Sequence, residues 1–136
     1  MSWRLLLTSF LLVAGCDSPS SDGGATIDVR GTWRYRATQS APALEIDGEL
    51  RITEQTERFF TGTAALRETD VQGTQQTRAG ALSGRVIGAD VLDFDIFIDA
   101  QARRHVARMV GDSIGGTWSA AGAAGLSGPF SARKTP

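Results

Sequence analysis

Two side-chain types used in nucleophilic catalysis lie close together in the sequence. Ser113 follows Gly111 and Asp112, and His105, the single histidine, comes shortly before them. A nucleophilic serine needs a base within hydrogen-bond reach, an acid that orients the base, and donors for the oxyanion. Gly-Asp-Ser is also ordinary turn chemistry, in which the aspartate bonds its own backbone. The sequence favours a turn with His105 at the rim or surface, and it predicts no catalytic residues.

A row of four aspartates, Asp90, Asp93, Asp95 and Asp99, is a candidate for calcium binding. Alternate residues of a strand lie about 6–7 Å apart, whereas calcium ligands converge to about 2.3–2.6 Å from one ion. A solvated strand face therefore explains them better. One histidine and one cysteine form no transition-metal cluster. No glycine-rich phosphate loop opens a helix, so we expect neither a metal nor a cofactor.

The composition sets the class of the protein. The chain has 136 residues, of which 41% are hydrophobic, and a formal net charge of −1. This length fits one domain of ordinary size. The charge argues against electrostatic binding of nucleic acid.

The first sixteen residues resemble the export signal of bacterial lipoproteins. An apolar core from Leu5 to Val13 follows Arg4 and is too short to span a bilayer. It ends in Val13-Ala14-Gly15-Cys16, which resembles a lipobox. The resemblance implies lipidation of Cys16 and an anchor in a membrane of the bacterial cell envelope, inner or outer, with the domain in the periplasm or at the cell surface. A cleaved secretory signal with an incidental cysteine is the alternative.

The chain divides into three parts on this interpretation. Residues 1–15 are the signal peptide, 16–26 are the lipidated cysteine with a tether, and 27–136 are the domain. The tether contains small, polar and turn-prone residues that bury little apolar surface, so we expect it to be flexible.

The pattern of apolar residues predicts an all-β domain. Apolar residues recur at every second position between glycine-containing breaks, as in Leu92, Phe94, Ile96 and Ile98. The alternation predicts eight strands, at about 31–38, 44–54, 58–69, 76–87, 90–99, 103–111, 113–120 and 126–133. Short connections favour an antiparallel up-and-down meander, and closure into an eight-stranded barrel leaves no free edges. A two-sheet β-sandwich is the alternative.

Charge pairing suggests a register for the fifth and sixth strands. A loop at residues 100–103 would place Asp99 opposite Arg104 and Asp95 opposite Arg108. That phase puts Val106 and Val110 on the outer face with the arginines, whereas the opposite phase turns the arginines inward. The sequence leaves the phase open.

Gly31-Thr32-Trp33 resembles the Gly-x-Trp start of lipocalins and avidins, the calycin barrels. The resemblance implies that Trp33 packs at the closed end of the barrel with an arginine of the last strand across it. Arg133 stands where that arginine would be. We therefore expect Trp33 and Arg133 to form a barrel-closing pair.

Two classes of function remain open, and neither is enzymatic. In the favoured one, side chains fill the barrel and its outer face binds an envelope protein partner. In the other, the barrel holds a small apolar or amphipathic ligand. The ligand-lining residues would then be Trp33, Tyr35, Leu66, Phe94 and Ile96.

Overall fold

The computed structural model describes residues 26–122 and 126–136. The lipobox, Cys16 and the tether up to residue 25 lie outside the described residues, so they stay predictions. No helix in the described ranges is long and apolar enough to cross a membrane.

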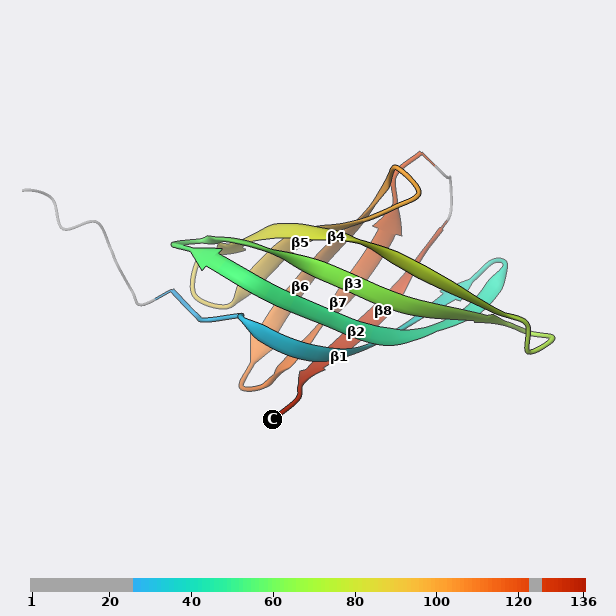
Figure 1. Ribbon diagram of the computed structural model, residues 1–136, viewed down its shortest axis with the longest axis horizontal. Coiled ribbons are helices and arrows are strands. Elements are labelled where there is room, and N and C mark those ends of the chain that lie inside the picture. Colours follow the sequence, from blue (N-terminus) through green and yellow to red (C-terminus); the bar gives the residue numbers. More distant parts are fainter. Residues whose placement is uncertain (1–25, 123–125) are drawn as a thin grey trace, which may run out of the picture.

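Eight antiparallel strands form one closed barrel in which each strand pairs with its neighbours in sequence and the last strand pairs with the first (Figure 1). The strands are β1 (Gly31–Ser40), β2 (Ala43–Thr56), β3 (Phe59–Asp70), β4 (Gln75–Ile87), β5 (Val91–Ile98), β6 (Gln101–Val110), β7 (Ser113–Ala120) and β8 (Ser127–Lys134). The predicted all-β fold is confirmed. The sandwich alternative is excluded, because β1 and β8 join to complete the barrel.

The alternation of side chains divides the barrel into a packed interior and a wet exterior. In β5, for example, Leu92, Phe94, Ile96 and Ile98 are buried. The buried apolar residues in the described ranges lie between Val29 and Ala132 and form one cluster. The described residues therefore contain one continuous hydrophobic core, as expected of a domain.

Glycines on the inner face allow the strands to approach each other closely. A Cβ atom at Gly62 would collide with the backbone oxygen of Arg51, and one at Gly128 would collide with that of Thr38. Only a residue without a side chain fits such positions. The small inward residues thus let a small barrel close tightly.

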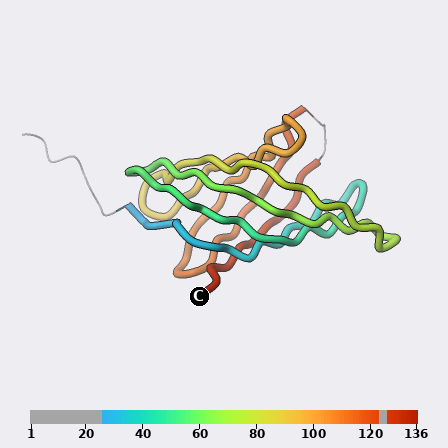
Figure 2. Tube along the Cα trace, viewed as in Figure 1, coloured from blue at the N-terminus to red at the C-terminus, as the bar shows by residue number. Residues whose placement is uncertain are grey.

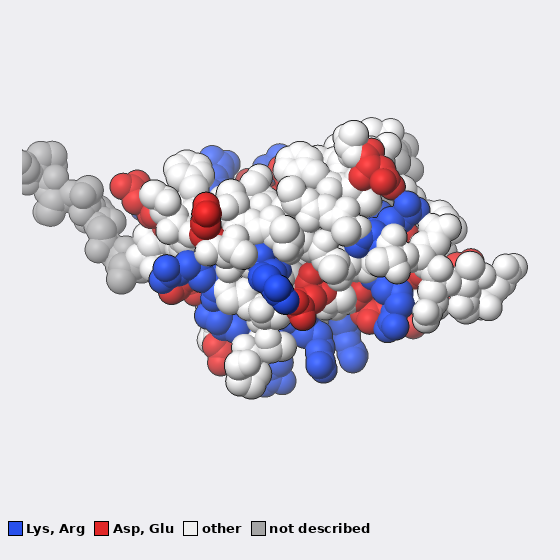
Figure 3. Space-filling model, in the orientation of Figure 1, with Lys and Arg blue, Asp and Glu red and all other residues white. Residues whose placement is uncertain are grey.

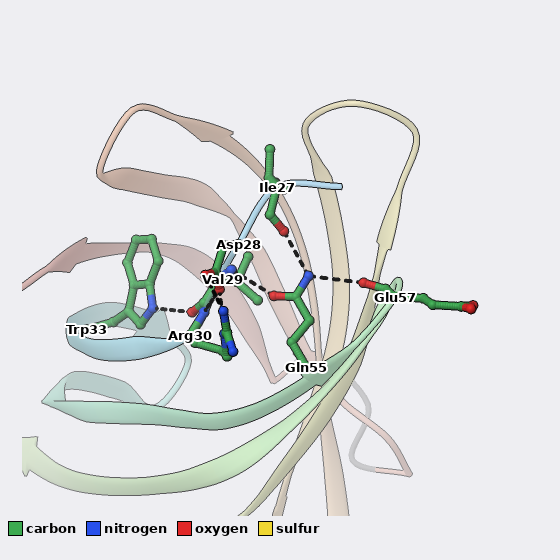
Figure 4. Close-up of polar contacts among 7 residues, drawn as sticks. All are labelled: Ile27, Asp28, Val29, Arg30, Trp33, Gln55 and Glu57. Carbon is green, nitrogen blue, oxygen red and sulfur yellow. Dashed lines mark hydrogen bonds and ion pairs between the residues drawn. The ribbon is translucent and has the colours of Figure 1, made fainter. Parts of the chain in front are cut away.

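The backbone trace in Figure 2 shows the chain entering and leaving the barrel at one end. At this closed end, residues 27–29 lie across the opening before β1 begins (Figure 4). The turns β2–β3, β4–β5 and β6–β7 surround the same end. The opposite, open end carries the turns β1–β2, β3–β4, β5–β6 and β7–β8.

The pairing of β5 with β6 differs from the predicted register. Asp95 lies opposite Arg104 and Val91 lies opposite Arg108, because the turn contains only Asp99 and Ala100. Both turn residues have positive φ, 52° and 62°, the conformation that a tight two-residue hairpin turn requires.

The sequence left open which face of the sixth strand points outward. In the structure, the arginines of β6 lie on the outer face. Arg104 and Arg108 are exposed, and Val106 and Val110 share their face with 47% and 73% of their surface exposed. Arg104 pairs diagonally with Asp93 at 2.9 Å, and Arg108 lies 3.5 Å from Asp90.

Candidate functional site

A short segment before β1 plugs the closed end of the barrel. The side chain of Gln55 accepts a hydrogen bond from the Val29 backbone N–H at 2.9 Å and donates one to the Ile27 carbonyl at 2.8 Å. The Trp33 indole donates to the Val29 carbonyl at 2.9 Å (Figure 4). Val29 and Trp33 are fully buried. This plug was not predicted from the sequence, although Ile27 and Val29 continue the apolar alternation ahead of Gly31.

The cation over the Trp33 ring is Lys134, whose Nζ lies 5.7 Å from the ring centroid. The predicted partner, Arg133, was one position off. Lys134 lies opposite Trp33 in the register, while Arg133 lies opposite Arg34 and is exposed. Because successive side chains of a strand point to opposite faces, Arg133 cannot reach the inner side where the indole packs.

All five predicted lining residues lie in the interior: Trp33, Tyr35, Leu66, Phe94 and Ile96 have 0–3% of their surface exposed. A cavity that admits water would leave exposed surface on the side chains of its walls. The barrel around these five residues is therefore filled by the protein itself.

Aromatic rings from different strands fill the middle of the barrel. His105 stacks on Phe94 with centroids 4.6 Å apart and meets Phe130 edge-on at 4.8 Å. Tyr35 stacks on Phe130 at 5.7 Å, and Phe60 lies 6.2 Å from Phe94. These rings contact one another and occupy the middle of the barrel.

His105 is fully buried in this cluster, which corrects its predicted place at the rim or surface. Its Nδ1 lies 2.8 Å from the Arg103 carbonyl, which can only accept, so Nδ1 carries the proton. Nε2 then accepts a hydrogen bond from the Tyr35 hydroxyl at 2.9 Å. Burial lowers the pKa of His105 to about 4 and raises the pKa of Tyr35 above its ordinary value. Both groups are neutral at pH 7.

His105 has no contact with Ser113. Ser113 is exposed at the start of β7, while His105 points into the barrel from β6. The two side chains lie on opposite faces of the sheet. Gly111 and Asp112 form the turn between the two strands, and Gly111 has a φ of 58°.

A buried ion pair lies at the open end. Glu68 is 7% exposed and accepts a hydrogen bond from Arg103. Arg103 also lies over the Trp118 ring, 5.7 Å from its centroid, and the Trp118 indole donates to the Thr38 carbonyl at 3.1 Å. Arg78 lies 3.6 Å from Glu68 and 2.9 Å from Asp99. These polar residues were not predicted to form a group, because they come from different strands.

The outer surface has a groove of about 630 Å³ over the neighbouring strands β2, β1 and β8. We call it the β1–β2 groove. Within it, Arg67 holds Asp47 through two hydrogen bonds of 2.8 and 3.1 Å, and Arg36 lies opposite Asp47 in the register. It is lined by Arg36, Ala37, Thr38, Glu45, Ile46, Asp47, Arg67, Pro129, Phe130 and Ser131. The groove thus combines charges of both signs with apolar surface.

Comparison with known proteins shows the fold. No family model and no curated protein matches the sequence. Among solved structures, a de novo designed fluorescence-activating β-barrel is similar, with a TM-score of 0.60 and 16% identity over 78% of this chain and 93% of that one. A redesigned barrel bound to DFHBI has a TM-score of 0.62 and 11% identity, covering 78% of this chain and 94% of its own.

A second redesigned barrel gives a TM-score of 0.63 with 12% identity, over 79% of this chain and 91% of that one. These likenesses cover nearly the whole of each designed barrel. The chain is therefore an eight-stranded antiparallel barrel with a lipocalin-like fold, as the calycin resemblance of Gly31-Thr32-Trp33 led us to expect.

Proposed function

We propose that this protein is a lipid-anchored lipoprotein of the bacterial cell envelope that acts by binding, without catalysis, through the outer face of its barrel. The observation that carries the proposal is the filled interior. His105, Phe94 and Phe130 occupy the centre of the barrel in mutual contact. The β1–β2 groove, by contrast, offers about 630 Å³ on the outside.

The groove has the features of a site for an extended segment of an envelope protein. Its volume lies within the roughly 300–1,000 Å³ of typical binding pockets. Thr38 and Ser131 provide polar groups at its sides, and Pro129 provides apolar surface. Charges of both signs in the groove give a partner its orientation more than its affinity.

In-cell photo-crosslinking tests the groove. A photoreactive side chain at Thr38 or Ser131 is expected to give a discrete protein adduct, because both residues line the groove. The matched control positions are Ala79 and Ala81, which are exposed on β4 and should give no such adduct. Equal adducts from all four positions, or none from the groove, would contradict this function.

The anchor is tested separately at Cys16. Mass spectrometry of the membrane-extracted protein should show an acylated N-terminal Cys16. Two or three acyl chains, at about 0.8 kcal/mol per buried methylene, hold a protein essentially permanently. The Cys16→Ser variant should therefore leave the membrane fraction on a carbonate wash. Normal maturation and continued membrane retention of this variant would refute the anchor.

Binding of a small apolar or amphipathic ligand is the second candidate. The designed barrels that this chain resembles include two bound to DFHBI, which favours it. The buried Glu68–Arg103 pair with Trp118 at the open end is a polar site such a ligand could meet. This candidate requires the aromatic cluster to move, since its rings occupy the ligand's place.

A further inference from the structure

Three arginines lie together on the outside of the seam between β1 and β8. Arg34 lies directly opposite Arg133, and Arg36 lies two positions further along β1. We call these three residues the arginine face. Among the described residues, none of the three lies within ion-pair distance of a carboxylate: the acids opposite them on β2, Glu49 and Asp47, are held by Arg51 and Arg67.

The direct pairing of Arg34 with Arg133 is unfavourable in the absence of an anion. Like charges directly opposite each other in a sheet are destabilising. Guanidinium groups on neighbouring strands present several N–H donors that match phosphate geometry. Figure 3 shows basic side chains along the edge of the molecule where β1 lies in Figure 1.

The position of the face points to a membrane as the partner, and this step rests on the proposed lipid anchor. The described chain begins at residue 26, at the closed end, and ten positions separate it from Cys16. The tether that the composition of these residues leads us to expect spans roughly 16–19 Å as a random coil, which would bring the face within reach of the lipid surface. Arg34 and Arg133 lie toward the same closed end, near the start of β1 and the end of β8.

We propose that the arginine face docks the barrel sideways onto an anionic phospholipid surface. The overall charge does not favour this binding. Removal of residues 1–16 takes away Arg4, one of the 14 basic side chains, and leaves 13 basic against 15 acidic side chains. Attraction must then come from the local cluster, acting within about 8 Å at physiological ionic strength. Arg36 belongs both to the arginine face and to the β1–β2 groove. In this orientation the groove therefore opens beside the membrane.

Vesicle sedimentation tests the proposal on residues 17–136, which contain the hydrophobic core but neither the apolar signal nor Cys16. We expect binding to phosphatidylcholine vesicles that contain phosphatidylglycerol, weak binding to phosphatidylcholine alone, and loss of binding at high salt. At about 1 kcal/mol for each arginine near the surface, the triple variant R34Q/R36Q/R133Q should lower the partition coefficient on the order of 100-fold.

The matched control is R85Q/R104Q/R108Q, which removes the same charge from β4 and β6. It should change the partition coefficient by less than about threefold, since those arginines belong to ion pairs on the outer face of other strands. Equal losses in the two triple variants, equal binding to both vesicle types, or no binding to the anionic vesicles would overturn the proposal. Because the measurement uses protein without Cys16, its failure leaves the anchor and the groove to their own tests.

Discussion

Replacing Trp33 with alanine is expected to lower the free energy of unfolding by about 3–5 kcal/mol, the usual cost of removing a buried large aromatic side chain. Trp33 is fully buried at the closed end. Its indole also holds the Val29 carbonyl and lies under Lys134. The substitution therefore opens a cavity and releases the plug in one step. Urea or thermal denaturation followed by circular dichroism measures the effect.

Arg34→Ala is the matched control, because Arg34 directly follows Trp33 on β1 and its side chain is exposed. Exposed substitutions of this kind usually change stability by less than about 0.5 kcal/mol. A loss below about 1 kcal/mol for Trp33→Ala would show that Trp33 is peripheral and that the closed end is not packed as described.

Acidification is expected to remove about 3 kcal/mol of stability between pH 6.5 and pH 4. His105 has a pKa of about 4 when folded, lowered by burial from its ordinary 6.5. The unfolded chain therefore takes up a proton in this range while the folded protein does not. Stability is at its full value above the unfolded pKa and falls with the pH until the folded pKa is reached. Chemical denaturation at a series of pH values measures the slope.

The double variant Tyr35→Phe/His105→Phe removes the titrating group together with its hydrogen-bond partner. Replacing both members of a buried polar pair by apolar groups of similar shape is often nearly neutral. Its stability should therefore change little between pH 6.5 and pH 4. The ion pair of Asp28 with Arg30 acts mainly below this window, because its stabilisation is lost as the pH falls from the ordinary pKa of Asp28, 3.8, to its folded pKa of about 2. Equal acid sensitivity in both proteins would exclude His105 as the cause.

The strands and their closure could be predicted from the sequence because alternation is a local signal. Leu92, Phe94 and Ile96 alternate with Asp93 and Asp95, and this pattern alone places a strand with one packed face. The closure of the barrel followed from short connections and the need to pair every edge. The inward glycines were also visible, but only the close backbone contacts at Gly62 and Gly128 show that they tighten the barrel.

The register of β5 and β6 could not be predicted, since it depends on the turn. Asp99-Ala100 lacks the glycine that marks most two-residue turns, and the charge pairing instead indicated a loop at residues 100–103. The buried His105 was nevertheless within reach of sequence reasoning. Any phase that places Arg104 and Arg108 outside must turn His105 inward, because side chains alternate along a strand.

The open-end cluster and the β1–β2 groove were out of reach for another reason. Glu68 and Arg103 come from strands that are not neighbours in the sheet, and they meet only across the barrel. Charge patterns along a sequence report pairs on one strand or on adjacent strands. A contact across the interior depends on the tilt and curvature of the closed barrel.

The central claim is that the protein's own side chains fill the barrel, which leaves the outer face for binding. Native mass spectrometry of the protein purified from its host membrane, compared with the same sample under denaturing conditions, tests this claim most directly. We expect the same mass under both conditions, that of the acylated chain. A small molecule retained in stoichiometric amount under native conditions, and lost on unfolding, would contradict it.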